Sequence, residues 1–223
     1  MVLNFNIAID GPAGAGKSTV AKLVAGKLGF TYIDTGAMYR AIALQALNDG
    51  VSMNDASGLV RSAKDAAVNL KTDPGGEMRV LLNGKDVTEQ IRAPEVSRVV
   101  SLVARIPEVR KQLITMQKAM AAKGGVVMEG RDIGTSVLPE AKVKVFLYAT
   151  PQERARRRRE ELAQKGCYID SSAMEAEIAE RDRIDSSRKT NPLIPAPDAE
   201  LIDCSFLTVE QVVNIIIKKV LQG

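Results

Sequence analysis

Residues 11–18 read Gly-Pro-Ala-Gly-Ala-Gly-Lys-Ser, which matches the phosphate-binding pattern G-x-x-x-x-G-K-[ST] in full. Glycines let the backbone curl, so that successive N–H groups point at phosphate oxygens. In this pattern Lys17 can reach the β- and γ-phosphates of a nucleotide, and the Ser18 hydroxyl can bind Mg²⁺. We call residues 11–18 the phosphate loop, and the loop predicts a site for a nucleoside triphosphate.

The sequence on either side of the phosphate loop supports this interpretation. Residues 4–9 form a short apolar run typical of a strand, and residues 18–28 carry apolar side chains at helical spacing. A strand that leads through a Gly-rich loop into a helix places the positive end of the helix dipole at the phosphates. The alternative is a Gly-rich turn that matches by chance, and the strand–loop–helix order argues against it.

The rest of the chain alternates between strand-like and helix-like segments. Short apolar runs predict strands at 30–34, 125–129, 143–148 and 200–203. Helical patterns cover 35–47, weakly 50–66, then 94–104, 107–123, 150–165, a segment from Ser172, and 208–221. Thr150, Ser172 and Thr208 are expected to cap their helices. This order predicts an α/β fold, a doubly wound parallel sheet in three α/β/α layers.

Residues 67–87 have a different pattern. Residues 68–70 and 78–82 alternate like strands around Asp73-Pro74-Gly75-Gly76, and Asn83-Gly84 predicts a hairpin turn into residues 85–87. We therefore expect a small antiparallel sheet inserted within a single domain that spans residues 1–223.

Composition narrows the classes of function. The chain has no histidine, which excludes histidine-activated nucleophiles and histidine metal sites. A phosphate acceptor is already anionic at neutral pH, so phosphoryl transfer between nucleotides needs mainly positioning and charge neutralisation. The net charge of +4 is mild, and there is no apolar run of transmembrane length or secretory leader pattern. With two distant cysteines, these features indicate a cytoplasmic protein that binds no membrane.

Arginines recur where a site for two polyphosphates would need them. They are Arg40, Arg110, Arg131, the run at 154–159, Arg181 and Arg188. Guanidinium groups bind phosphate in bidentate fashion. Arg131 follows an expected buried strand, where ligands bind in open α/β sheets. Spacings of four and three would place Arg181, Asp185 and Arg188 on one helix face.

Four motifs together resemble the bacterial-type cytidylate kinases, which belong to the nucleoside monophosphate kinases. They are residues 9–19 (IDGPAGAGKST), 34–40 (DTGAMYR), 129–135 (EGRDIGT) and 181–188 (RDRIDSSR). The resemblance covers nearly the whole chain and implies transfer of the γ-phosphoryl group of ATP to CMP or dCMP with Mg²⁺. It also implies a monophosphate-binding subdomain at 35–105, which contains the inserted sheet, and a lid at 153–170 whose closure excludes water.

The resemblance also implies roles for individual residues. The ATP-binding set is Gly11, Pro12, Ala13, Gly14, Ala15, Gly16, Lys17, Ser18, Thr19, Arg154 and Arg158. The residues with catalytic roles are Lys17, Arg131, Arg181 and Arg157. Ser18 would bind Mg²⁺, and Glu129 could do so through water. The alternative is that Glu129 merely caps a loop, and the sequence favours neither interpretation.

The CMP-binding set implied in the same way has ten members. They are Thr35, Tyr39, Arg40, Ser101, Arg110, Arg131, Asp132, Arg181, Asp185 and Arg188. Arg40, Arg131 and Arg181 would grip the phosphate, and Ser101, Arg110 and Asp132 would contact the cytosine edge. Cytosine offers an amino donor with two acceptors, so a carboxylate and a guanidinium complement it. Tyr39, Asp185 and Arg188 would face the sugar.

Other interpretations remain open at this stage. Arg131–Asp132 could be a structural ion pair, Arg181–Asp185 an exposed helix pair, and the 154–159 run a solvated face or a nucleic-acid patch. The whole chain could be a kinase for UMP, AMP or shikimate, a GTPase switch or a nucleic-acid-dependent ATPase. The chain lacks an Asn-Lys-x-Asp guanine signature, and aromatic residues are few. We expect a monomer that acts on nucleotides and binds no nucleic acid.

Overall fold

The computed structural model describes residues 5–73, 75–164 and 166–222. Asn4, Pro74 and Lys165, which fall in predicted segments, lie outside the described residues. The chain forms two compact units. The first unit comprises residues 1–32 and 123–223, and the second comprises residues 33–122.

The first unit is built on a five-stranded parallel sheet with the order β2-β6-β1-β7-β8. The strands are β1 Asn6–Asp10, β2 Thr31–Asp34, β6 Val126–Glu129, β7 Val143–Tyr148 and β8 Glu200–Asp203. All four residues of β6 and four of the five in β1 are buried, as expected for apolar strands covered on both faces. Ile9 pairs with Glu129 and Asp10 with Phe146, so β1 and β6 end within one residue of each other and β7 continues two residues further.

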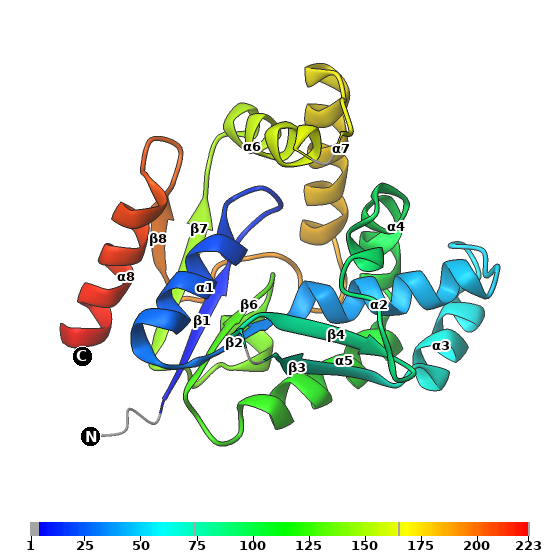
Figure 1. The fold of residues 1–223 in the computed structure, drawn as a ribbon, viewed down its shortest axis with the longest axis horizontal. Coiled ribbons are helices and arrows are strands. Elements are labelled where there is room, and N and C mark those ends of the chain that lie inside the picture. The colour runs from blue at the N-terminus through cyan, green and yellow to red at the C-terminus, as the bar shows by residue number, and fades with distance from the viewer. Residues whose placement is uncertain (1–4, 74, 165, 223) are drawn as a thin grey trace. The chain divides into compact units, whose positions relative to one another are not determined.

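Helices α1 Lys17–Leu28 and α8 Val209–Gln222 lie side by side against this sheet (Figure 1). Val20 and Val24 of α1, Ile216 of α8 and the apolar residues of β1 and β7 form one core cluster. Helices α6 Pro151–Ala163 and α7 Ser171–Ser186 pack on each other through a smaller cluster that contains Leu162, Met174 and Ile178. This arrangement confirms the predicted α/β fold class.

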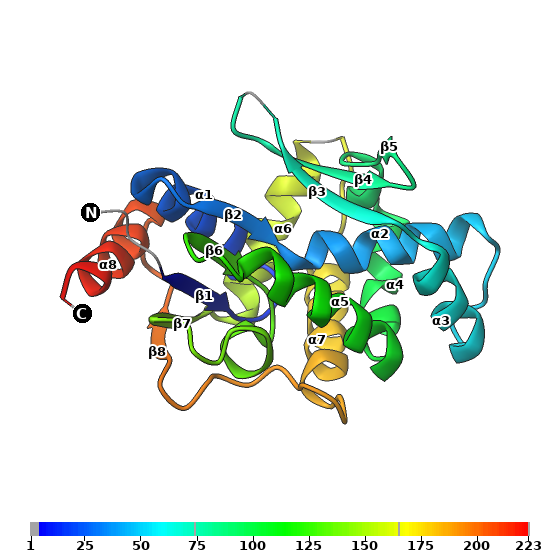
Figure 2. The same cartoon turned by 90° about the horizontal axis from the view of Figure 1, so that it is seen from below.

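The second unit contains helices and the small antiparallel sheet. Its helices are α2 Thr35–Asn48, α3 Ala56–Asp65, α4 Pro94–Ala104 and α5 Pro107–Ala121, with a short 3₁₀ turn at Gln90–Arg92. Strands β3 Val68–Thr72, β4 Met78–Leu82 and β5 Lys85–Asp86 pair in that order, and β3 and β4 lie against α2 (Figure 2). Asn83 and Gly84 both have positive φ, as a two-residue hairpin turn requires, so the predicted insert is confirmed.

Two of the three expected helix caps are confirmed. The Thr150 hydroxyl accepts from the Glu153 N–H, and Thr208 and Gln211 bond each other's backbone N–H. The third was wrong, because Asp170 caps α7 through the N–H of Ser172. An aspartate two residues upstream is an equally good cap and also accepts from the Ser172 hydroxyl, so the helix begins one residue earlier.

Several predicted boundaries moved by a few residues. The first strand ends at Asp10, α5 ends at Ala121, and the weakly helical segment narrows to α3, which Asp55 caps. Within the described part of the chain, every helix is too short or too polar to cross a membrane.

The reciprocal cap of α8 yields a test of local stability. Thr208→Ala should lower the free energy of unfolding by about 1 kcal/mol, because the Gln211 N–H loses its acceptor. Urea denaturation measures this change. Thr115→Ala is the matched control, since that exposed threonine bonds only the preceding turn of α5 and alanine favours a helix interior. Equal losses in the two variants would contradict the capping account.

Candidate active site

The phosphate loop follows β1 directly, and its glycines are required by close backbone approaches. A Cβ on Gly11, which has φ +146°, would stand 2.0 Å from the Leu147 carbonyl oxygen. A Cβ on Gly14, which has φ +76°, would stand 2.9 Å from the Arg154 carbonyl oxygen. The loop therefore lies in contact with the end of β7 and the first turn of α6. Any side chain at either position would push the loop away from them.

Lys17 is buried, with 5% of its surface exposed, and its Nζ donates to the Pro12 carbonyl at 2.7 Å. Burial, together with the charges of nearby Arg131 and Arg181, lowers the pKa of this ammonium to about 7, while Glu129 and Asp10 oppose the shift. Burial is thus the main cost to the charged form of Lys17, and two nearby cations and two nearby carboxylates act on it in opposite directions. An anion in this place would favour the charged form.

Arg131 lies just past β6, as the sequence predicted. Its Nε donates to Asp185 Oδ2 of α7 at 3.0 Å, and Nη1 donates to the Gly130 carbonyl at 3.2 Å. Burial alone would raise the pKa of the Asp185 carboxyl, but Arg131, Arg181 and Arg188 outweigh burial and hold the pKa below its usual range. The structure therefore brings together Arg131, Asp185 and Lys17 within the first unit.

Arg188 differs from the helix-face prediction. Helix α7 ends at Ser186, so Arg188 lies beyond it rather than on the face of Arg181 and Asp185. The Arg188 Nε donates to the carbonyl oxygen of Asp185 at 3.1 Å, and Nη1 is 3.7 Å from its Oδ1. Arg188 and Asp185 are therefore in contact as the spacing of three predicted, although Arg188 lies beyond the last turn of the helix.

Asp132 is buried at the start of a single wide turn, residues 133–137, whose N–H groups at Ser136 and Val137 bond the Asp132 carbonyl. Asp10, at the end of β1, accepts from the N–H groups of Ile133 and Gly134, each at 2.8 Å. Asp10 was quoted within a motif but given no role from the sequence. Its partners are more than 120 residues away, and no local pattern marks such a pair.

Glu129 is the last residue of β6 and is buried. Its Oε1 accepts from the Tyr32 hydroxyl at 2.7 Å, and its charge supports the protonated form of Lys17. Ser18 and Thr19 are exposed in the first turn of α1. The hydroxyl of Ser18 and the carboxylate of Glu129 are both hard oxygen ligands of the kind that Mg²⁺ prefers.

The arginines of α6 divide into buried and exposed groups. Arg154 is buried, and its Nη1 donates to the Ala13 carbonyl at 3.0 Å and to Asp182 Oδ2 at 2.6 Å. Its Nε donates to the Ala149 carbonyl at 3.1 Å. Arg154 therefore joins the phosphate loop to both helices α6 and α7. Asp182, the partner in α7, was not among the residues singled out from the sequence.

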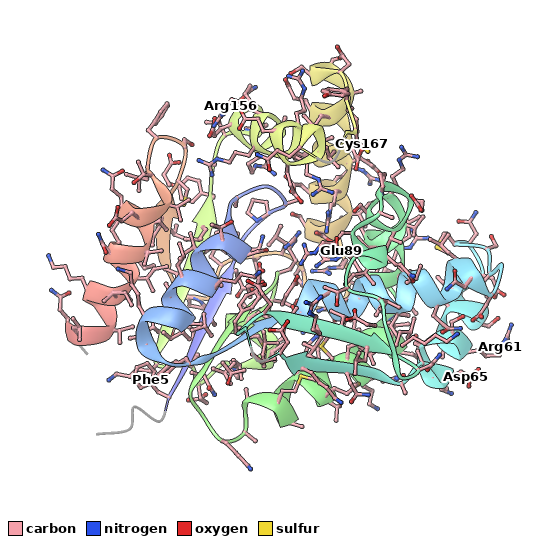
Figure 3. The ribbon with its side chains drawn as sticks, in the orientation of Figure 1. Phe5, Arg61, Asp65, Glu89, Arg156 and Cys167 are labelled. Atoms are coloured by element: carbon pink, nitrogen blue, oxygen red, sulfur yellow. The ribbon has the colours of Figure 1, made fainter. Side chains whose placement is uncertain are left out.

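The remaining arginines of α6 have carboxylate or carbonyl partners. Arg157 donates to Glu153 at 2.7 Å and to the Cys204 carbonyl at 2.6 Å, and Arg158 donates to Glu161 at 2.6 Å. Arg156 is 55% exposed, pairs with Glu153 and Glu160, and lies on the outer side of α6 (Figure 3). For Arg156 the solvated-face interpretation is thus confirmed.

The second unit holds two further groups of the predicted residues. Arg40 Nη2 is 2.5 Å from Asp34 Oδ2, and Asp34 also caps α2 through the Ala37 N–H. Burial opposes ionisation of Asp34, but Arg40 and Arg92 lower its pKa below the ordinary value. Asp34 is a second carboxylate that stood in a quoted motif without a role. Thr35, the first residue of α2, is buried beside it.

Tyr39 and Arg110 form the other group. The Arg110 guanidinium carbon is 5.5 Å from the centre of the Tyr39 ring, and Nη1 donates to the Ala104 carbonyl at 3.3 Å. Arg110 is only 1% exposed, and Ser101 on α4 is also buried. Each of the two units therefore presents its own set of the predicted polar residues.

Comparisons with known proteins give a consistent result. A family model described as Cytidylate kinase matches residues 7–222. A cytidylate kinase of Pelotomaculum thermopropionicum is 62% identical over 218 residues, which cover 98% of this chain and 96% of the relative. One of Geobacillus thermodenitrificans is 54% identical over 206 residues, 92% of each. A solved gluconokinase of Sinorhizobium meliloti aligns with TM-score 0.52 at 13% identity, covers 100% of this chain and 94% of its own, and is similar in fold alone.

The contacts of Arg154 generate a stability test. Arg154→Met should lower the free energy of unfolding by about 3 kcal/mol, because it leaves the Asp182 carboxylate and the Ala13 carbonyl without their buried donor. Chemical denaturation measures the loss, and adding Asp182→Leu should recover part of it. Arg156→Met on the exposed face of the same helix is the matched control and should change little. Equal effects in the two single variants would refute the buried link.

Proposed function

The chain belongs to the cytidylate kinase family, and on this premise we propose that it transfers the γ-phosphoryl group of ATP to CMP or dCMP, giving ADP and CDP or dCDP. The observation that carries the mechanism is the positive charge at the ends of β1 and β6. Lys17 is buried, and both its burial and the charges of nearby Arg131 and Arg181 depress its pKa, while Glu129 and Asp10 oppose the shift.

Phosphoryl transfer needs this arrangement. The transferred group carries its charge on oxygens throughout the reaction, so prearranged cations stabilise it without reorganisation. Lys17 and the N–H groups of the phosphate loop would hold the triphosphate, and Arg157 would contact the transferred group. Arg131, already oriented by Asp185, would hold the acceptor phosphate in line for attack on the transferred group. Arg40 and Arg181 would be further donors to the acceptor phosphate.

The residues at the phosphate loop suit a magnesium ion. Ser18 offers an exposed hydroxyl in the first turn of α1 that would bind the ion, and Glu129 offers a buried carboxylate that would act on it through water. When bound, Mg²⁺ neutralises charge on the β- and γ-phosphate oxygens. Ser18 and Glu129 would orient the ion, while Gly11 to Gly16 and Thr19 would surround the phosphates.

Recognition of the acceptor nucleoside is a further part of the proposal. We propose that Ser101, Arg110 and Asp132 contact the cytosine edge, and that Thr35, Tyr39, Asp185 and Arg188 contact the nucleoside. Asp132 would accept from the N4 amino group of cytosine, whereas uracil has an acceptor at that position. Residues 35–105 would form the monophosphate-binding part, and residues 153–170 the lid that excludes water.

The setting in which the enzyme works is part of the proposal. Its ligands would be small nucleotides, and it would act as a cytoplasmic monomer without nucleic acid. The mild net charge of +4 and the lack of tryptophan support this choice over a single-strand-binding ATPase.

An acceptor panel tests the proposed reaction. ADP release would be measured with Mg²⁺, ATP and one of CMP, dCMP, UMP, AMP, GMP or shikimate, with a sample that lacks acceptor. We expect rapid turnover with CMP and dCMP, and a fall of roughly 100- to 1,000-fold in Lys17→Met. Preference for another acceptor would be consistent with the kinase chemistry but would contradict the assignment of CMP and dCMP as substrates. ADP release independent of acceptor would overturn the kinase itself.

The base-reading role has its own test. Asp132→Ala should lower kcat/KM for CMP by about 10- to 100-fold, the cost of one charge-assisted hydrogen bond, and should change KM for ATP by less than about 3-fold. Steady-state kinetics with each substrate varied separately gives both values. Equal loss for the two substrates would make Asp132 a structural residue.

A further inference from the structure

Asp10 has an unusual position for a carboxylate. It is the last residue of β1, only 3% exposed, and immediately precedes the phosphate loop. Both of its oxygens accept from backbone N–H groups of the 133–137 turn, Oδ1 from Ile133 and Oδ2 from Gly134, each at 2.8 Å. The side chain therefore ties the strand before the phosphate loop to the segment that follows Arg131 and Asp132.

The 133–137 turn needs this carboxylate. The first N–H groups of any helical turn have no acceptor within the turn, so other groups must satisfy them when they are buried. Ile133 is 1% exposed and Gly134 is buried, which removes water as the acceptor. Asp10 thus caps the turn from a different element of the structure, whereas helix caps normally come from the residue just before the helix.

Gly134 is enclosed on its other sides. A Cβ at this residue would stand 3.3 Å from Ala196 Cβ and 3.4 Å from both Lys144 Cδ and Asp10 Oδ2. Lys144 in turn donates to Asp198 at 2.7 Å. The start of the turn is therefore fixed by Asp10 on one side and by packing on the others.

We propose that Asp10 is a positioning residue for the acceptor: by capping the 133–137 turn it sets the backbone direction of Asp132 and so the discrimination between cytosine and uracil. The inference rests on the proposed function, because it assigns Asp10 to the base-reading side of that site. In this proposal the role of Asp10 differs from that of the phosphate loop, which begins at the next residue. Asp10 has no direct contact with substrate in this role.

The ionised form of Asp10 is the one that this role requires. A carboxylate accepts at both oxygens, whereas a carboxylic acid would direct an O–H at one of the two N–H donors. Burial raises the pKa of Asp10 to about 6, with Asp132 raising it too, while the two backbone N–H groups and Lys17 lower it. The group is therefore ionised at neutral pH.

Asp10→Asn is the principal test, because asparagine keeps the shape and offers only one acceptor. We expect kcat/KM for CMP to fall about 10- to 100-fold and the preference for CMP over UMP to narrow, since small displacements of positioned groups have effects of this size. KM for ATP should change by less than about 3-fold. Loss of stability alone would leave the CMP/UMP ratio unchanged at temperatures well below the unfolding midpoint.

Two comparisons separate positioning from destabilisation. Val213→Ala, in the core between α8 and the sheet, should lower the melting temperature and leave the CMP/UMP ratio as in the wild type. In the Asp132→Ala background, adding Asp10→Asn should cause little further loss of discrimination, because Asp10 acts through the Asp132 side chain. Additive effects would overturn the proposal.

If Asp10→Asn does not fold, Asp10→Glu is the second test. The longer side chain keeps the charge and both acceptor oxygens but displaces them from the Ile133 and Gly134 N–H groups, so KM for CMP should rise several-fold with ATP kinetics unchanged. An unchanged KM for CMP would overturn the role of Asp10. A wild-type enzyme inactive on CMP would instead refute the proposed function, whereas an active wild type with unchanged discrimination in Asp10→Asn would refute only this inference.

Discussion

The burial of Lys17 among other cations is the constraint on which the rest of the site depends. A buried ammonium is costly unless it is paired, and its neighbours here include Arg131 and Arg181 as well as carboxylates. The Lys17 Nζ donates a hydrogen bond to the Pro12 carbonyl. Lys17, Arg131 and Arg181 are therefore cations held in place before a polyphosphate binds, and prearranged charge of this kind stabilises transferred phosphate oxygens.

Such a site requires neighbours that keep the cations in place. Asp185 orients Arg131, and Arg154 holds the phosphate loop to α7 through Ala13 and Asp182. Gly11 and Gly14 allow the loop to lie against β7 and α6, where a Cβ would collide with carbonyl oxygens. Asp10 extends the same framework to the turn after Asp132. Backbone carbonyls and buried carboxylates thus determine where each positive group points.

Sequence patterns were sufficient for what is local. The phosphate loop, the strands and the hairpin at Asn83-Gly84 follow from spacing and turn chemistry, and the predicted strand 200–203 matches β8. The cap of α7 was misplaced because Asp170 and Ser172 are both good caps two residues apart. Local rules cannot choose between such neighbours. The end of α7 at Ser186, before Arg188, was also missed by the spacing rule.

Long-range pairs are what the sequence could not provide. Asp10 and Ile133 are 123 residues apart, and Arg154 and Ala13 are 141 apart, so their contacts exist only once the sheet and helices assemble. The motifs indicated that Arg131 and Asp185 matter, but only the fold reveals that they bond each other. Asp34 and Asp182 were missed because each acts through an arginine rather than through a recognisable pattern of its own.

The most direct measurement is the number of protons taken up when MgATP binds. A phosphate beside Lys17 raises its pKa above about 7, so binding takes up protons between the free and bound pKa values and weakens as pH rises through that range. Calorimetry at pH 8 in buffers of different ionisation enthalpy should give an uptake of about one proton, absent in Lys17→Met. Equal, near-zero uptake in both proteins would contradict the claim that buried, crowded positive charge forms the phosphate site.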